Sequence, residues 1–302
     1  MIRHVAARSI SRPAADNLCR TPFVARVLAA FEQACDLVTP NGDVIAIVTP
    51  QIGDGPLNIV VEAEPGVLGM VEQDASVELD EGTLRFSRLE IALEDALAWE
   101  PCPDWSALRT LLEAIKRSLP ALQAIAMSHA PTDSLLAALD TGRPHATPNK
   151  AENPAPYVIS TCGRALAARP GSTAKNLSSG REEDATLLQD AAAHLAGLGT
   201  GLTPAGDDFL AGAMLWAWLT HPAPGPLCQA LVEVVAPRTT TLSAAFLRAA
   251  ARGECEPSWH RLLAVLSTSG AAQLAPAVQQ IMAHGATSGA DMLAGFLWMA
   301  GG

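Results

Sequence analysis

The sequence lacks several features that would assign the protein to a well-defined class. Its longest apolar run, from Phe209 to Leu219, is about half of the ~20 residues that a membrane-spanning helix needs. It contains no Walker A loop, no GxSxG nucleophile elbow and no HExxH zinc motif. We therefore expect no transmembrane segment, and the sequence offers no local signature of P-loop, serine-hydrolase or zinc-protease chemistry.

Basic residues are also scarce. The chain has 20 Lys and Arg against 31 Asp and Glu, a formal net charge of −11, which argues against nucleic acid as a partner. The hydrophobic content of 49% and the charged content of 17% exclude a disordered chain and indicate a globular one. Most of the acidic excess lies in residues 1–150, so residues 151–302 are the better location for an anionic substrate.

The six cysteines show no CxxC pair and no Cys/His spacing of a metal site, so we interpret them as reduced thiols in a cytoplasmic protein. The first twenty residues carry Arg3, Arg8, Arg12 and Arg20 but no apolar stretch of a secretory signal. An organellar presequence is one interpretation of this segment. A loosely held, exposed terminus is the one that we favour.

Residues 1–100 are predicted to form a small, mostly antiparallel β domain. Short β-prone runs alternate with turn residues such as Asn41-Gly42 and Pro65-Gly66, as a set of short strands requires. The expected strands are 44–48, 57–61, 67–71, 76–79 and 83–86. Residues 23–38 fit either a helix or a strand. Gly53-Asp54-Gly55-Pro56 is interpreted as a hairpin turn, although a place in a ligand site stays open.

Residues 101–302 are predicted to form a larger, mostly helical domain, which makes the fold α+β. Helical spacing begins at 105–119 and recurs at 135–139. Residues 141–181 are rich in Pro, Gly and Ser, and we expect a long loop region there. Ser179 and Glu182 have capping-box spacing, which predicts a helix that ends near Leu195.

The most informative stretch follows that helix. Four glycines, residues 197, 199, 201 and 206, precede Asp207, Asp208 and an apolar helix. Such a loop lets the backbone approach a ligand and turn its amides toward an anion. A carboxylate at a helix start is commonly only a cap, but two adjacent carboxylates repel each other unless a cation or a donor separates them. A ligand, metal or catalytic role for at least one of them therefore stays open.

The chain repeats this pattern near its C-terminus. Asp208-Phe209-Leu210-Ala211-Gly212 aligns with Asp291-Met292-Leu293-Ala294-Gly295, and Thr203 falls opposite Thr287 with one residue of slack. Glycines at 212 and 295 would let the two helices cross closely. We therefore expect both helix starts to meet in one site.

A third polar cluster, Arg238-Thr239-Thr240-Thr241-Leu242-Ser243, precedes another apolar stretch. One of its hydroxyls can be an ordinary helix cap. Four hydroxyls beside an arginine are more than a cap needs, and Arg238 could bind a phosphate or carboxylate in a bidentate manner, although a surface role is equally open.

Three segments, taken in order, resemble the AllH-like family. They are Gly199-x-Gly201-Leu202-Thr203-Pro204-x-Gly206-Asp207-Asp208, the hydroxyl segment 239–243 and Gly285-x-Thr287-Ser288-Gly289-x-Asp291. The resemblance covers residues 197–296, with a weak match at Gly53-x-Gly55-Pro56. It implies a cytoplasmic subunit of an oxamate carbamoyltransferase in allantoin breakdown, which acts with FdrA-like and AllG-like partners on carbamoyl phosphate and oxamate or a related amide-carboxylate.

With that resemblance, the motifs define a candidate site. Its expected catalytic residues are Asp207, Asp208 and Asp291, and the first two could hold Mg²⁺. The expected substrate-binding residues are Gly199, Gly201, Thr203, Gly206, Arg238, Thr239, Thr240, Ser243, Thr287, Ser288 and Gly289. Two alternatives remain: a non-catalytic binding or assembly subunit that needs an FdrA-like partner, and a metal-dependent phosphohydrolase.

Overall fold

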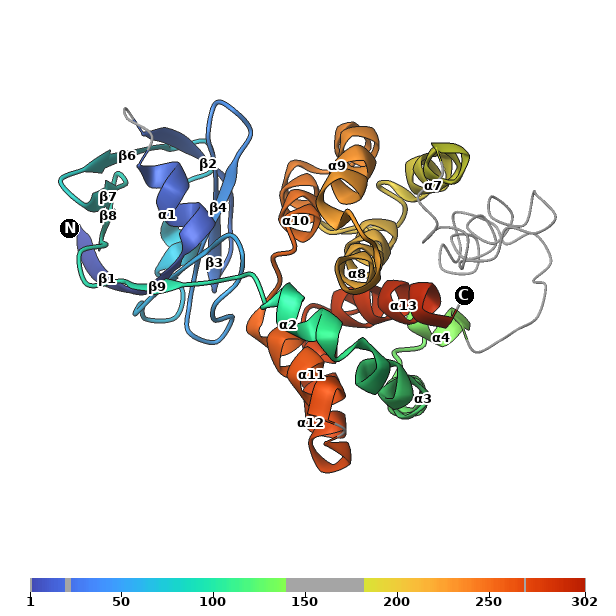
Figure 1. The fold of residues 1–302 in the computed structure, drawn as a ribbon. Coiled ribbons are helices and arrows are strands. Elements are labelled where there is room, and N and C mark those ends of the chain that lie inside the picture. The colour runs from blue at the N-terminus through green and yellow to red at the C-terminus, as the bar shows by residue number, and fades with distance from the viewer. Residues whose placement is uncertain (1, 20–22, 140–181, 269, 302) are drawn as a thin grey trace. The chain divides into compact units, whose positions relative to one another are not determined.

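The computed structural model describes residues 2–19, 23–139, 182–268 and 270–301, so the loop expected at 141–181 lies outside the described residues. The chain forms two compact units (Figure 1). One comprises Met1–Pro101 with Cys255–Pro257, and the other comprises Cys102–Glu254 with Ser258–Gly302. The first is built from strands and the second from helices, which confirms the α+β class.

The N-terminal unit is one nine-stranded sheet. Its strands are β1 (Arg3–Ser11), β2 (Val24–Ala30), β3 (Ala34–Val38), β4 (Val44–Val48), β5 (Asn58–Val61), β6 (Ser76–Asp80), β7 (Thr83–Arg85), β8 (Leu89–Ala92) and β9 (Leu97–Trp99). The strand order is β5-β4-β3-β2-β6-β7-β8-β1-β9, and an additional β1–β5 pairing closes the sheet on itself. Most pairs are antiparallel; β1–β8, β1–β9 and β4–β5 are parallel.

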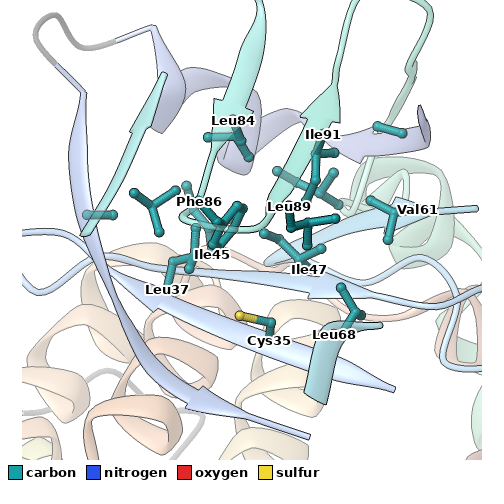
Figure 2. Close-up of a cluster of buried hydrophobic side chains, with 14 of the residues drawn as sticks. Cys35, Leu37, Ile45, Ile47, Val61, Leu68, Leu84, Phe86, Leu89 and Ile91 are labelled. Atoms are coloured by element: carbon teal, nitrogen blue, oxygen red, sulfur yellow. The ribbon is translucent and has the colours of Figure 1, made fainter. Parts of the chain in front are cut away.

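The closed sheet surrounds a single hydrophobic core (Figure 2). Alternate residues of most strands lie in this core, among them Leu37, Ile45, Ile47, Leu84 and Ile91, all of which have no exposed surface. This alternation is what β-branched and leucine residues at every second position of a pleated strand produce. The members of the core cluster all lie between residues 7 and 91.

The interpretation of the N-terminus as a loosely held segment was wrong. Residues Arg3–Ser11 form β1, which pairs with three other strands. Arg3 and Arg8 are exposed and make surface ion pairs with Glu64 and Glu62, while Ala7 and Ile10 are buried. The exposed residues lie mainly in the first half of β1 and the buried ones in its second half, and a register shift between Ala7 and Ser9 interrupts the alternation. The charge of the arginines therefore concealed a strand that shows no clear period of two.

Two other local predictions also need correction. Residues 67–71 were expected to form a strand, but Leu68–Met70 form a 3₁₀ helix, η1. The segment 53–56 was expected to be a hairpin turn, yet β4 and β5 pair in parallel, and a tight hairpin joins only antiparallel strands. The ambiguous stretch 23–38 forms the antiparallel strands β2 and β3.

The second unit is helical throughout its described part. Its helices are α2 (Trp105–Thr110), α3 (Leu112–Ser128), α4 (Leu135–Leu139), α7 (Glu182–Leu195), α8 (Ala205–Thr220), α9 (Pro224–Val235), α10 (Thr241–Ala251), α11 (Pro257–Thr268), α12 (Ala271–Met282) and α13 (Ser288–Gly301), with 3₁₀ helix η2 at Ala236–Arg238. Helix α1 (Arg12–Leu18) belongs to the first unit. Within the described ranges, none of the helices combines the length and apolar character needed to cross a bilayer.

Helices α8 and α13 pack against each other at the centre of the helical unit (Figure 1). A Cβ atom on Gly212 would overlap the carbonyl oxygen of Met292, and one on Gly295 would overlap the carbonyl oxygen of Phe209. The two helices therefore cross backbone against backbone at the repeated glycines. Aromatic side chains flank the crossing, including Trp216 edge-on to Phe296 at 5.1 Å between ring centroids.

Candidate functional site

The loop between α7 and α8 presents a run of backbone amides. Gly199 and Gly201 both have positive φ, of 125° and 96°, which an L residue adopts only under strain. Within the described residues, the amides of 199–203 donate to no protein acceptor. Gly201 and Leu202 are exposed, and the Leu202 carbonyl accepts a 2.6 Å hydrogen bond from Thr240. The loop is thus held from one side while its amides remain available to a ligand.

Asp207 holds three separate segments together. Its Oδ1 accepts from the Gly197 amide at 2.9 Å, and its Oδ2 accepts from the hydroxyls of Thr239 and Ser243, the latter at 2.7 Å. The side chain is 2% exposed. Hydrogen bonds to a charged group contribute roughly 1.5 to 3 kcal/mol each. Asp207 therefore fixes the glycine loop against the start of α10 and has little capacity left for a metal ion.

The hydroxyl segment 239–243 is divided between two roles. Thr240 caps α10 by accepting from the Ser243 amide at 3.0 Å. Thr239 and Ser243 bind Asp207, which explains why more hydroxyls are present than one cap requires. Arg238 is exposed, and its guanidinium donates to the Val234 carbonyl. A guanidinium has five N–H groups, so this contact leaves others for an anion.

Asp208 and Asp291 occupy equivalent places in the repeat, in the first turns of α8 and α13. Asp208 is 8% exposed and Asp291 is fully buried. The Asp291 Oδ1 accepts a 2.6 Å hydrogen bond from the Leu135 amide, at the start of α4, while Oδ2 is buried without a hydrogen-bond partner. A helix N-terminus favours negative charge, which is one reason for carboxylates here.

The pKa of Asp291 is raised to about 6, chiefly because burial disfavours the charged carboxylate. Hydrogen bonds from the Leu135 amide and the Thr287 side chain oppose that shift, and the nearby charge of Asp133 adds to it. At any pH near 6, a larger fraction of Asp291 is therefore protonated than of an ordinary surface aspartate.

The two repeated helix starts lie next to each other. The Thr203 and Ser288 hydroxyls are 3.1 Å apart, although 85 positions separate these residues in the sequence. The glycine two positions before each repeated aspartate lies against the end of the preceding helix. A Cβ atom on Gly206 would overlap the Leu195 carbonyl oxygen, and one on Gly289 would overlap that of Ile281. The pairs α7–α8 and α12–α13 thus repeat the same packing.

These contacts also show how the predicted substrate-binding glycines are used. The Gly206 amide donates to the Leu198 carbonyl at 2.9 Å, and the Gly289 amide donates to the His284 carbonyl at 3.2 Å. Both amides are thus occupied by the fold. Thr287 reaches Asp291 through its side chain, and Ser288 faces Thr203. Gly199, Gly201, Thr203 and Ser288 line the loop side of the candidate site.

The described residues contain no group of three or more His, Cys, Asp or Glu side chains that could hold a metal ion. The donors around Asp207 are an amide and two hydroxyls, which are the partners of a carboxylate in a protein network. The donor set around Asp207 therefore does not fit the expected Mg²⁺ site.

One contributor to the site was missed from the sequence. The segment that leads into α4 brings the Leu135 amide to Asp291, 156 positions away. Ser134 caps this short helix by accepting from the Ala137 amide at 3.3 Å, and its hydroxyl donates to the Pro131 carbonyl at 2.7 Å. The polar run Pro131-Thr132-Asp133-Ser134 was the available signal for a helix start, but nothing in it indicates a partner so distant in sequence.

Two family models match the chain. A model described as "Oxamate carbamoyltransferase subunit AllH" matches residues 195–300, which include both glycine loops and the hydroxyl segment. A model described as "AllH family N-terminal domain" matches residues 6–98, which are nearly the whole closed sheet. No solved structure matches the chain.

Proposed function

The chain belongs to the AllH family, and from this premise we propose that it binds carbamoyl phosphate or its acceptor as a subunit of a multi-subunit carbamoyltransferase. The family places it among carbamoyltransferase-related subunits. The acceptor in this proposal is oxamate or a related amide-carboxylate. Its partner subunits would be FdrA-like and AllG-like proteins, and its process the breakdown of allantoin in the cytoplasm.

The observation that carries the proposal is the meeting of two remote helix starts at Thr203 and Ser288. A small ligand needs several polar groups that converge from different segments on one point. The amides of 199–203, which donate to no acceptor among the described residues, and the hydroxyls of Thr203, Thr287 and Ser288 form such a group. Because Asp207 fixes the glycine loop, these donors are held in place before the ligand arrives, which reduces the cost of binding.

Carbamoyl transfer makes clear demands on such a site. The acceptor nitrogen forms a bond to the carbamoyl carbon, the bond from that carbon to the phosphate oxygen breaks, and the nitrogen loses a proton. Preorganised amides and hydroxyls stabilise the oxygen charge that develops. In this proposal the loop amides and Arg238 bind the anion, Asp208 takes the proton, and Asp207 acts as a positioning residue through the loop that it holds.

The phosphate charge is the reason to propose partner subunits. Lys116, in α3, is the one lysine among the described residues, so the loops contribute no lysine of their own there. A phosphate dianion would then depend on Arg238, on the loop amides and on a basic group from elsewhere. A neighbouring subunit can supply that group, which agrees with the description of the family as a subunit.

Two other functions compete with this proposal. A non-catalytic binding or assembly subunit would use the same fold only to organise an FdrA-like partner. A metal-dependent phosphohydrolase would release phosphate without an acceptor and would need bound Mg²⁺ or Mn²⁺. The hydrogen bonds that occupy Asp207 favour the carbamoyltransferase over the phosphohydrolase.

The test is a thermal-shift titration of the full chain with carbamoyl phosphate, phosphate and oxamate, each with and without Mg²⁺. Ligand at 100 times its Kd stabilises the fold by about 2.7 kcal/mol. We expect a shift that is independent of Mg²⁺ and that is lost in a Thr203→Val, Ser288→Ala double variant. Ser267→Ala removes an exposed hydroxyl on α11 and is the matched control.

Each alternative predicts a different result. An assembly subunit shows no shift with any of these ligands but raises the activity of its partners when it is added to them. A phosphohydrolase shows a shift only with the metal present and releases phosphate in the absence of oxamate.

A further inference from the structure

Asp291 has a buried acceptor atom that no donor satisfies. The residue has no exposed surface, and its Oδ2 has no hydrogen-bond partner. Its Oδ1 is used by the Leu135 amide. Leaving a buried carboxylate oxygen without a donor costs free energy, so the position favours a donor beyond those that the described residues supply.

Asp291 lies one helical turn from Ser288, whose hydroxyl meets that of Thr203 and joins the two repeats. Ser288 precedes Asp291 by three residues in the same helix, so the two side chains lie on one face, roughly 5 to 6 Å apart at Cβ. Ser288 and Thr203 are half-buried, whereas Asp291 is enclosed. A ligand that replaces the contact between the two hydroxyls would reach them with one end and Asp291 with the other.

The protein groups that would meet the two ends of the ligand differ in their hydrogen-bonding chemistry. The hydroxyls and the exposed amides of 199–203 can donate to ligand oxygens. An ionised carboxylate only accepts, so Asp291 would repel a second carboxylate or a phosphate and would bind an N–H group. A small molecule with oxygens at one end and a primary amide at the other satisfies both.

We infer that Asp291 is the recognition group for the primary amide of the ligand, with Oδ2 accepting an N–H bond while Thr203 and Ser288 bind its oxygen end. This inference rests on the proposed function and specifies it. The ligand class is an amide-carboxylate or a carbamoyl ester, and the site discriminates the –NH₂ group from a methyl group of the same size.

Two pairs of ligands test this directly with the full-length chain at pH 7.5. Oxamate and pyruvate have the same charge and nearly the same shape, but pyruvate carries a methyl group in place of the –NH₂ group. Carbamoyl phosphate and acetyl phosphate differ in the same way. By calorimetric titration we expect the amide member of each pair to bind at least about tenfold more tightly, because a hydrogen bond to a charged acceptor is lost with the methyl analogue.

Asp291→Asn is the matching variant, because its remaining oxygen can still accept from the Leu135 amide while Oδ2 becomes a donor. We expect the preference for oxamate over pyruvate to fall to about onefold. Asp133→Asn removes a neighbouring charge without changing the acceptor and should retain the preference. The wild-type comparison stands even if the Asp291 variant does not fold.

The outcomes separate the inference from the proposed function. Equal affinity of wild-type protein for oxamate and pyruvate would overturn the role of Asp291 and leave ligand binding at the loops intact. If neither member of either pair binds, the proposed function fails together with the inference.

Discussion

Asp207 and Asp291 have different environments, although they look alike in the sequence. Asp207 accepts three hydrogen bonds from two segments of the chain, the glycine loop and the hydroxyl segment 239–243, and thus organises the loop. Asp291 accepts the Leu135 amide through Oδ1, and its Oδ2 is left without a partner. A buried carboxylate with a full set of donors stabilises structure, whereas one with an open position has capacity for a ligand.

The raised pKa of Asp291 predicts how its replacement changes stability with pH. The folded-state pKa is about 6 against an ordinary value of 3.8, so between these values the folded chain binds more protons than the unfolded chain. The contribution of Asp291 to the free energy of unfolding is therefore largest below pH 4, falls as the pH rises toward 6 and stays low above it.

In Asp291→Asn this titration is absent. The free energy of unfolding of the variant relative to wild type should therefore rise by on the order of 2 to 3 kcal/mol between pH 4 and pH 7. Urea denaturation at a series of pH values, followed by circular dichroism, measures it. Parallel profiles for the two proteins would show that Asp291 has an ordinary pKa in the fold.

At the scale of elements, the helical unit contains the same packing arrangement twice. In each copy a glycine two positions before the aspartate meets the end of the preceding helix, and a glycine four positions after it meets the partner helix. The second kind, Gly212 and Gly295, determines how closely α8 and α13 approach. The distance between Thr203 and Ser288, on which the proposed ligand site depends, follows from that approach.

The crossing predicts a large difference between two glycine-to-alanine substitutions in helices. In Gly212→Ala the added methyl group overlaps the Met292 carbonyl, so α8 and α13 must separate, at a cost of about 3 kcal/mol or more. Gly225→Ala is the control. Apart from its neighbours in the chain, a Cβ atom there meets the Trp218 ring at 4.0 Å, an ordinary van der Waals contact.

Melting temperatures of the two variants test this. We expect a clear decrease for Gly212→Ala and no decrease for Gly225→Ala. Oxamate binding should weaken only in the first, because only there do the two helix starts separate. Equal melting temperatures for both variants would show that the crossing tolerates a methyl group.

At the scale of the whole molecule, we propose that the two compact units are independent domains with a boundary near residue 101. Every member of the N-terminal core lies between residues 7 and 91, so that core is complete without the helical unit. The family model for the N-terminal domain matches almost the same segment, residues 6–98. The short stretch Cys255–Pro257 also joins the first unit, through a 2.9 Å hydrogen bond from Cys255 to the Pro101 carbonyl.

A fragment of residues 1–101 should therefore fold by itself. We expect a β-sheet circular dichroism spectrum and one cooperative thermal transition, with stability reduced only slightly by the loss of the Cys255 contact. A single substitution in the core, Ile47→Ala, should lower its stability by about 2 to 5 kcal/mol. A fragment without a cooperative transition would show that the two units fold as one domain.

Much of the fold was predictable because it depends on local pattern. The strand 44–48, the strand expected at 76–79 and the helix that ends at Leu195 follow from periodicity and turn residues. The helix expected at 105–119 begins at Trp105 as predicted, but it is divided at Leu111 into α2 and α3. The predictions failed where pairing partners decide the structure. Whether 53–56 is a hairpin turn depends on whether β5 pairs with β4 in parallel, and no local signal specifies that.

In the candidate site, too, local pattern predicted some features and remote contacts decided the others. The repeated Gly-x-Asp pattern predicted that α8 and α13 cross at Gly212 and Gly295, because glycine in two apolar helices permits a close approach and the two motifs have the same spacing. It did not predict which donors face which aspartate. The Leu135 amide reaches Asp291 from 156 positions away, and sequence distance carries no information about such a contact.

The sequence alone thus determined the α+β class, most of the helices and strands, the helix crossing and the family, since each depends on residue types at fixed spacing. Only the tertiary structure decided that Asp207 is satisfied by three donors from two other segments and that Asp291 retains an acceptor without a partner. The physical reason is that hydrogen-bond satisfaction is a property of atoms from remote segments meeting at about 3 Å, and it is fixed only when the whole chain has packed.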